Sequence, residues 1–191
     1  MKDKILDTVA RLIERYGLKK FTVDEVASEL HISKKTIYQY FHGKDEMIRA
    51  YFEETLASDR QSVLEALKGE RNFSERIHAI VHSSHCYRMP IPVLDEAKKF
   101  YPSEWQKIED LKQFKMEIFQ NLLKQAEKDG ILRPDVNFGV LSSMLERISS
   151  MFLDTDFLLE NGLKSSQAVD EALNIIIYGI VKESGKVPSQ Q

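Results

Sequence analysis

Apolar residues recur at spacings of three and four along almost the whole chain, the pattern of helices that bury one face. No stretch alternates apolar and polar residues between turn residues, as a half-buried strand would. The chain is therefore predicted to be all-α, with about nine helices. Helices are expected up to Gly17, over Thr22–Leu30 and Ser33–Phe41, over about 45–67 and 73–87, from Ser103 to Gly130, and over about 138–152 and 166–182.

The segment Phe21–Phe52 carries the most specific pattern in the chain. Thr22–Glu25 has the sequence of a capping box at a helix start, and Ser33 can cap a second, very short helix. The turn His31–Ser33 separates the two helices, while Ile37 and Phe41 are expected to face inward with Leu30 and Ile32. This arrangement is typical of a helix-turn-helix, whose second helix enters a DNA major groove about 12 Å wide.

The outward side of that short second helix is polar and aromatic. At about 100° per residue, Lys35 and Gln39 point most directly away from Ile37 and Phe41. A lysine can meet phosphates or a guanine edge, a glutamine can pair with adenine, and a threonine methyl can meet a thymine methyl. The neighbouring candidates for DNA contacts are Lys34, Thr36, Tyr38 and Tyr40.

Two further candidates lie at helix starts, where backbone N–H groups attract phosphate. Thr22 offers a hydroxyl group there, and Lys44 offers a positive charge beside the start of the long helix. The alternative interpretation of all these residues is the solvated face of a small helical unit, since charge-rich faces are usually just that.

Residues 4–52, KILDTVARLIERYGLKKFTVDEVASELHISKKTIYQYFHGKDEMIRAYF, resemble the N-terminal domain of TetR-family transcriptional regulators. The resemblance rests on ILD…A…L…YG, T-V-x-x-V-A and S-K-x-T-I-Y-x-Y-F. Two departures stand out: His31 and Lys35 occupy positions where the family often has glycine. Carried over by position, the resemblance implies DNA contacts from Thr22, Lys34, Lys35, Thr36, Tyr38, Gln39, Tyr40 and Lys44.

The same resemblance implies a helical body that binds an unidentified small-molecule effector and forms a homodimer through its last two long helices. Such a dimer would recognise a palindromic operator in double-stranded DNA. The final predicted helix is compatible with this, because it is apolar almost all round and must bury two sides. Candidate effector-pocket residues, for which ordinary core is the alternative, are Tyr87, Met89, Phe100, Tyr101, Trp105, Phe114, Met144, Arg147 and Met151.

Three histidines in the body, His78, His82 and His85, fall on one strip of a helix about 60° wide. Histidines at i and i+4 are a familiar chelating pair, and the third could add a ligand. The alternative, which we favour, is a half-exposed polar border, because the sequence places no carboxylate beside them. We therefore expect no cofactor and no bound metal. If the protein does bind a metal, His78, His82 and His85 are the candidate ligands.

Composition narrows the class of protein. Residues 1–50 hold 10 Lys and Arg against 8 Asp and Glu, and residues 51–191 hold 17 against 22. A mildly basic head on an acidic body suits contact with phosphate at one end. The single cysteine, Cys86, and the lack of a long apolar run or signal peptide favour a cytoplasmic protein without membrane contact.

The sequence predicts a helix-turn-helix domain over 1–47, an effector-binding and dimerisation domain over 48–185, and a flexible tail over 186–191. The expected function is a TetR-like repressor released by a small molecule. An enzyme is not expected, since the chain has no Gly-rich phosphate loop, nucleophile elbow or HExxH motif. The alternatives are a metal-responsive regulator or helical metalloprotein using the histidines, and an architectural DNA-binding protein without an effector.

Overall fold

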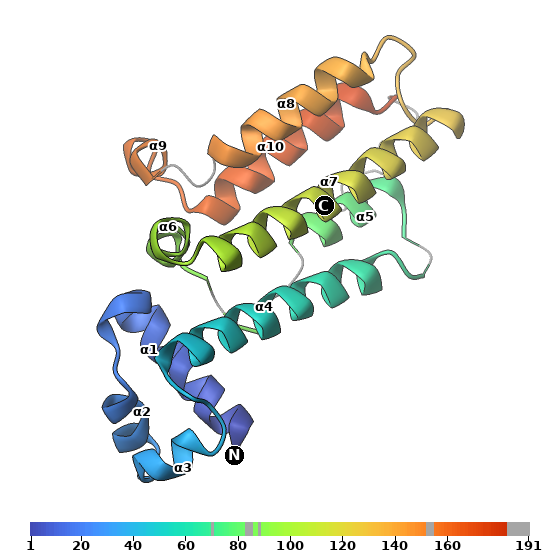
Figure 1. The fold of residues 1–191 in the computed structure, drawn as a ribbon. Coiled ribbons are helices and arrows are strands. Elements are labelled where there is room, and N and C mark those ends of the chain that lie inside the picture. Colours follow the sequence, from blue (N-terminus) through green and yellow to red (C-terminus); the bar gives the residue numbers. More distant parts are fainter. Residues whose placement is uncertain (70, 83–85, 88, 152–154, 183–191) are drawn as a thin grey trace, which may run out of the picture. The chain divides into compact units, whose positions relative to one another are not determined.

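The computed structural model describes residues 1–69, 71–82, 86–87, 89–151 and 155–182, and these residues form ten helices (Figure 1). Within the described residues the only β pairing is an isolated bridge between Leu132 and Val181. The all-α prediction is confirmed, with ten helices in place of about nine. The helices are α1 Lys2–Lys20, α2 Val23–Glu29, α3 Lys34–Tyr38, α4 Lys44–Ala66, α5 Phe73–Val81, α6 Ile91–Phe100, α7 Pro102–Lys128, α8 Phe138–Met151, α9 Thr155–Glu160 and α10 Ser165–Ile180.

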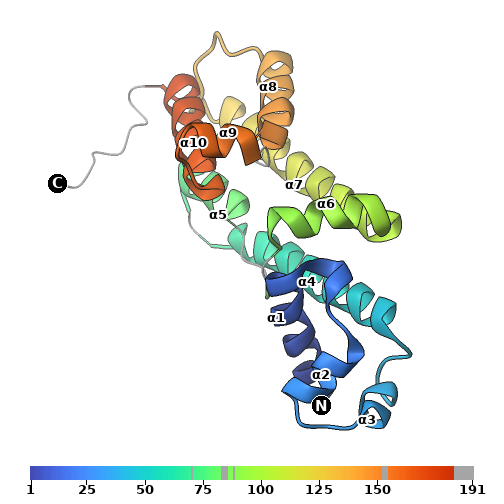
Figure 2. The same cartoon turned by 90° about the vertical axis from the view of Figure 1, so that its left-hand side faces the viewer.

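The chain forms two structural units, and α7 contributes to both of them (Figure 2). The first unit comprises Met1–Leu67 and His82–Gln113, and the second comprises Lys68–Val81 and Phe114–Gln191. The predicted domain boundary between residues 47 and 48 stays a prediction. The predicted tail, 186–191, lies outside the described residues.

The first unit is built around α1 and the first half of α4. Ile5, Val9, Ile13, Ile48 and Phe52 have no exposed side-chain surface and form the centre of its core. Burying side chains of this size stabilises a fold by about 1.5–3 kcal/mol each before the entropy of ordering is subtracted. The core fixes the two helices to which the short α2 and α3 attach.

A kink in α1 allows this unit to include α6. Gly17 adopts a left-handed backbone with φ of 80°, which interrupts the helix where the sequence predicts its end. The backbone N–H of Leu18, just after the kink, donates to Glu96 Oε2 on α6 at 2.5 Å. A Cβ added at Gly17 would lie 2.8 Å from that same carboxylate oxygen. Glycine is therefore favoured here by its backbone angle, and a larger residue would also require the Glu96 carboxylate to move.

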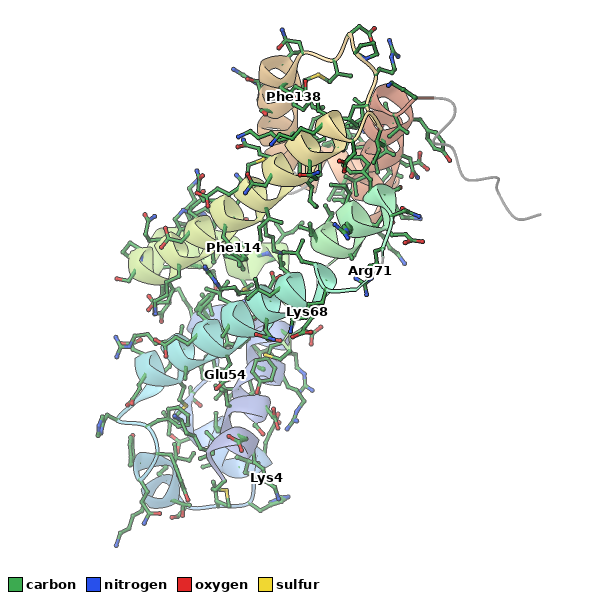
Figure 3. The ribbon with its side chains drawn as sticks, turned by 90° about the vertical axis from the view of Figure 1, so that its right-hand side faces the viewer. Lys4, Glu54, Lys68, Arg71, Phe114 and Phe138 are labelled. Atoms are coloured by element: carbon green, nitrogen blue, oxygen red, sulfur yellow. The ribbon has the colours of Figure 1, made fainter. Side chains whose placement is uncertain are left out.

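The second unit has its own hydrophobic core, and the side chains of its helices fill the space between them (Figure 3). Residues from α5, α7, α8 and α10 meet in it, so four stretches that are far apart in sequence bury one common cluster. The buried members of this cluster are Ile77, Phe119, Leu123, Ala126, Leu132, Leu141, Leu145, Leu173, Ile176, Ile177, Ile180 and Val181.

Three sequence predictions about helices were wrong. The helix expected over about 73–87 ends at Val81, and the sequence missed both α6 and the six-residue α9. Proline usually ends or breaks a helix, but two prolines lie at the start of α6. Pro90 in fact forms the N-cap of α6 and Pro92 is its second residue. Proline is tolerated there, because the first N–H groups of a helix have no intrahelical acceptor.

No helix in the described part of the chain is both long and apolar enough to cross a bilayer.

Candidate nucleic-acid interface

The helix-turn-helix is held by capping interactions at both of its helix starts. At α2, the Thr22 N–H donates to Glu25 Oε2 at 2.7 Å, and the Glu25 N–H donates to Thr22 Oγ1 at 3.2 Å. At α3, Ser33 Oγ accepts the Thr36 N–H at 3.1 Å. Both predicted caps are confirmed. They satisfy backbone donors that would otherwise face water, and each cap stabilises its helix by about 1 kcal/mol.

The turn between α2 and α3 depends on one left-handed residue. His31 has φ of 53°, and it is the only non-glycine residue with positive φ in the described part of the chain. Histidine tolerates this conformation better than most residues, so the turn forms without the glycine that the family often has there. The Ile32 N–H then closes the turn by donating to the Ala27 carbonyl at 3.0 Å.

Below the turn, Ile37 and Phe41 are buried as predicted, with 0% and 1% of their surface exposed. Leu30 and Ile32 are half-buried, so they form the edge of this small core. The short α3 thus has one face packed against the rest of the first unit.

The opposite face of α3 and the two residues after it are exposed. Tyr38 and Tyr40 have 49% and 40% of their surface exposed, although apolar rings of this size are usually covered. Lys34, Lys35 and Gln39 are exposed beside them. The structure therefore brings five of the eight predicted DNA-contact residues to one solvent-facing surface, which we call the α3 surface: Lys34, Lys35, Tyr38, Gln39 and Tyr40.

The remaining three candidates make contacts within the protein. Thr36 is half-buried, with its hydroxyl 2.9 Å from Ser33 Oγ, and the Thr22 hydroxyl donates to Glu25 Oε2 at 2.9 Å. Lys44 is the first residue of α4, and its Nζ donates to the carbonyls of Lys19 and Phe21, both at 2.7 Å.

Lys44 is unlike the other lysines of this region, because its ammonium group is partly withdrawn from water. The group lies 4.4 Å from the centre of the Phe21 ring, and burial lowers its pKa. It therefore joins the start of α4 to the end of α1 and to the residue that follows α1. The sequence could not indicate this role, since the two carbonyls lie more than 20 residues earlier.

Lys34 has a partner of its own on the surface. Its Nζ lies 2.6 Å from Asp24 Oδ1, and this hydrogen bond raises the pKa of the lysine. Both side chains are largely exposed, so water screens the pair. A phosphate group could replace Asp24 at little cost, which keeps Lys34 available as a ligand for an anion.

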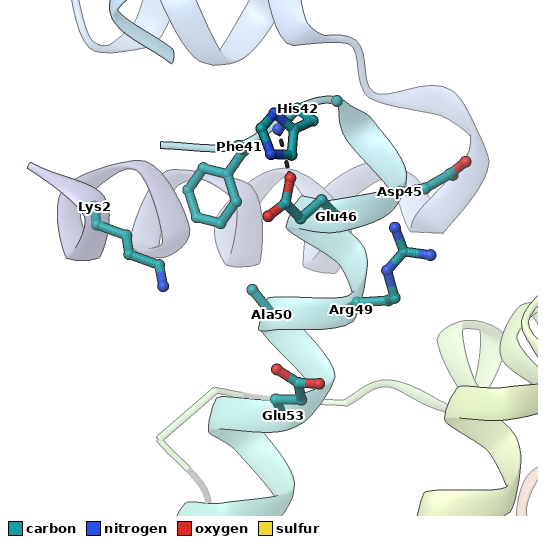
Figure 4. A pocket seen from close by; sticks show the side chains of 9 residues that line it. Lys2, Phe41, His42, Asp45, Glu46, Arg49, Ala50 and Glu53 are labelled. Atoms are coloured by element: carbon teal, nitrogen blue, oxygen red, sulfur yellow. Dashed lines mark hydrogen bonds between the residues drawn. The ribbon is translucent and has the colours of Figure 1, made fainter. Parts of the chain in front are cut away.

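A cavity of about 610 Å³ lies near the start of α4 (Figure 4). Lys2 and Arg49 line it together with the carboxylates of Asp45, Glu46 and Glu53, so its charges are mixed. Glu46 Oε2 accepts the His42 N–H at 2.5 Å. Sequence reasoning did not find this cavity, and none of the predicted effector-pocket residues lines it.

Five of the predicted effector-pocket residues lie in the first unit: Tyr87, Met89, Phe100, Tyr101 and Trp105. Several of them attach the segment around α6 to α1 and α4. The Tyr87 hydroxyl donates to Asp7 at 2.8 Å, and the Tyr101 hydroxyl donates to Asp45 at 3.2 Å. Burial, and then the Asp45 carboxylate, raise the pKa of Tyr101 to about 12. Lys19 Nζ lies 3.8 Å from the centre of the Phe100 ring.

The other four candidates lie in the second unit, on α7 and α8. Phe114 is half-buried, whereas Met144 and Arg147 are exposed. Met151 is the last residue of α8, and its side chain lies outside the described residues. The effector pocket as a whole stays a prediction.

The histidine strip has a neighbour that the sequence did not indicate. His78 Nδ1 lies 4.0 Å from Asp170 Oδ1 on α10, so a carboxylate is present where none was expected. His82 directly follows the last residue of α5, and His85 lies outside the described residues.

Comparison with known proteins agrees with this geometry. Residues 5–51 match the family model described as bacterial regulatory proteins, tetR family. The HTH-type transcriptional regulator YvaF of Bacillus subtilis is 22% identical over 186 residues, covering 96% of this chain and 97% of its own. The HTH-type transcriptional repressor KstR2 of Mycobacterium tuberculosis is 24% identical over 194 residues, covering 95% of this chain and 94% of its own.

The fold is similar to solved structures along nearly the whole chain. A putative transcriptional regulator from Saccharomonospora viridis, solved in complex with choline, superimposes with a TM-score of 0.71. The two chains are 18% identical, and the match covers 95% of this chain and 98% of that one. At this identity the likeness shows a shared fold alone.

Proposed function

We propose, from the premise that this chain is a TetR-family helix-turn-helix transcriptional regulator and not an enzyme, that it represses transcription as a ligand-released homodimer. The observation that carries the proposal is the α3 surface. Cationic, amide and aromatic side chains stand there on a helix that is capped at its start and buried on its other face.

The residues of the α3 surface have different roles in binding DNA. Lys34 and Lys35 neutralise phosphates and supply affinity that depends on salt concentration but not on sequence. Gln39 presents paired donor and acceptor atoms to an adenine edge. Tyr38 and Tyr40 offer ring edges and hydroxyls to the groove wall. Lys44 and Thr22 act mainly by bracing α4 and α2, since their polar atoms already bond within the protein.

The exposed side of α10 supports the proposal of a homodimer. Ile175 and Tyr178 have 72% and 63% of their surface exposed, while Leu173, Ile176 and Ile177 on the same helix are buried. On α8, Val140 and Met144 are exposed, at 57% and 47%. Exposed apolar groups at helical spacing suit a self-complementary interface. Two copies would place their α3 surfaces about 34–36 Å apart, one turn of DNA.

Release by a small molecule would act through α6. Glu96 on α6 accepts the N–H of Leu18 at the kink of α1, and Tyr101 just beyond α6 donates to Asp45 near the start of α4. A ligand that favours another position of α6 would therefore disturb both helices that carry the helix-turn-helix. The choline complex of the S. viridis protein supports a small molecule as effector, without fixing its identity for this chain.

The first experiment selects bound fragments from a pool of random duplexes and then measures variants on the recovered operator. Gln39→Ala should weaken operator binding by about 1–3 kcal/mol and leave binding to random duplex nearly unchanged. Lys35→Ala should weaken binding to both duplexes and lower the slope of affinity against salt by about one.

Gln61→Ala is the matched control, because Gln61 is an exposed glutamine on α4 that bonds to Glu65 on its own helix. It should bind both duplexes like the parent chain. Recovery of sites without two-fold symmetry would contradict the dimer. Equal losses on operator and random duplex for Gln39→Ala would contradict its role in reading bases.

A further inference from the structure

An ion pair at the edge of the α3 surface joins the first residue of α3, Lys34, to the second residue of α2, Asp24. Lys34 Nζ lies 2.6 Å from Asp24 Oδ1, and the two side chains have 54% and 68% of their surface exposed. We propose that Asp24 competes with DNA phosphates for Lys34 and so lowers the affinity of the protein for every duplex. This inference rests on the proposed binding of DNA by the α3 surface, and it adds a residue that limits that binding.

The carboxylate of Asp24 offers Lys34 the same chemistry as a phosphate. Both groups present anionic oxygens, and a lysine binds either of them as a point charge. The hydrogen bond to Asp24 raises the pKa of Lys34, so the lysine stays charged in the pair. A phosphate that approaches Lys34 must displace this carboxylate or lie beside its negative charge, and both reduce the free energy gained on binding.

Lys35, the next residue of α3, shows what the pair changes. Its side chain is also exposed, and within the described residues no carboxylate lies at ion-pair distance from it. Its ammonium group can therefore bind a phosphate without losing a partner. On a duplex of any sequence, Lys34→Ala should weaken binding less than Lys35→Ala does.

Two other roles of Asp24 predict the opposite effect on DNA binding. Asp24 lies in the first turn of α2, where a carboxylate stabilises the positive end of the helix dipole. Its bond to Lys34 would also hold α3 against α2 if the pair were structural. In either role, loss of the carboxylate would weaken the helix-turn-helix and therefore DNA binding. Competition predicts tighter binding when the carboxylate is removed.

Direct repulsion between Asp24 and DNA is a third interpretation, and it also predicts tighter binding. Repulsion does not act through Lys34, so it persists when the lysine is absent, whereas competition requires the lysine. A double-mutant cycle separates the two cases, because it measures how far the effect of one change depends on the other residue.

The test uses the full chain and measures its Kd for the operator and for a random duplex at several salt concentrations. Asp24→Asn should tighten binding to both duplexes about two- to fivefold, the range of an exposed ion pair. The gain should fade as salt screens the charges. In the Lys34→Ala background, Asp24→Asn should leave both affinities nearly unchanged. Asp95→Asn removes an exposed aspartate of α6 in the same unit, so it is the control for net charge and should bind like the parent chain.

A measurement without DNA tests the pair by itself. Asp24→Asn should lower the pKa of Lys34, followed by NMR of its side chain, because Asp24 raises that pKa in the parent chain. An unchanged pKa would show that the pair does not form in solution and would overturn the proposal. Circular dichroism establishes that each variant is folded.

Two results with DNA would also overturn the competition. One is an Asp24→Asn variant that binds no tighter than the parent chain, and the other is an equal gain with and without Lys34. The parent chain still binds DNA in both cases, so the proposed function stands. A parent chain that binds no duplex would instead contradict the proposed function, and this inference with it.

Discussion

The α3 surface and the exposed side of α10 both present large side chains to solvent, and they differ in chemistry. Tyr38 and Tyr40 lie among lysines and a glutamine, whereas α10 exposes the apolar side chain of Ile175 and the ring of Tyr178. A polyanion with hydrogen-bonding edges is the complement of the first surface, and another apolar surface is the complement of the second.

The two surfaces also differ in how they are held. The α3 helix has five residues. It is held by the cap of Ser33, which directly precedes it, and by the buried side chains of Ile37 and Phe41. The α10 helix has sixteen residues and is anchored by a core that includes residues of α5, α7 and α8. A change in the α3 surface therefore tests local interactions, and a change in α10 tests assembly.

The largest effect is expected from Ile175→Glu. If the exposed side of α10 is a dimer interface, this change buries an uncompensated carboxylate in each copy, which costs about 3–5 kcal/mol. Sedimentation equilibrium should then show monomers at concentrations where the parent chain is a dimer.

Leu159→Glu is the control for that change. Leu159, on α9, has 75% of its surface exposed, so the substitution adds the same charge away from α10 and should leave the dimer intact. If the dimer persists in Ile175→Glu, the exposed side of α10 is not the dimer interface.

A smaller effect is expected from Gly17→Ala, which probes how α6 is attached to the unit that carries the α3 surface. The positive φ of residue 17 opposes a side chain, and a methyl group would displace the Glu96 carboxylate from the Leu18 N–H, so we expect a loss of about 1–3 kcal/mol in the free energy of unfolding. Urea denaturation measures it.

Gly43→Ala serves as the reference for that measurement, because residue 43 has an extended φ and no atom within 4 Å of an added Cβ. It should change the free energy of unfolding much less. Equal effects at residues 17 and 43 would contradict the expected strain at residue 17.

The smallest effect is expected from Ser33→Ala, which removes the cap of α3. We expect a loss of about 1 kcal/mol in stability and a several-fold weaker affinity for the operator, since α3 begins at this cap. Ser28→Ala, on an exposed position of α2, is the control and should alter neither. An unchanged operator affinity in Ser33→Ala would mean that DNA itself orders α3.

The helix-turn-helix could be predicted from sequence because its interactions are short. Thr22 with Glu25, Ser33 with Thr36, and the left-handed turn at His31 all involve residues within a few positions of one another. Caps and apolar spacing follow from such short interactions, so the predicted caps and the inward positions of Ile37 in α3 and Phe41 after it were confirmed.

The sequence was insufficient where a residue type is compatible with two local structures, or where the interaction joins residues far apart in the chain. Proline ends a helix at most positions but is favourable in the first turn, where Pro92 lies in α6. The local sequence does not distinguish these two cases. Lys44 stays a predicted DNA contact, but the sequence could not indicate that its ammonium group also bonds to the carbonyls of Lys19 and Phe21, which lie more than 20 residues earlier.

The sequence alone determined that this chain is helical, where its long helices run, and which residues of α3 face outward, because periodicity and capping act within a few residues. Tertiary structure decided that α6 holds the kink at Gly17 and that Asp170 stands beside His78. These contacts join segments far apart in the chain, and no local pattern encodes which distant side chains packing will bring together.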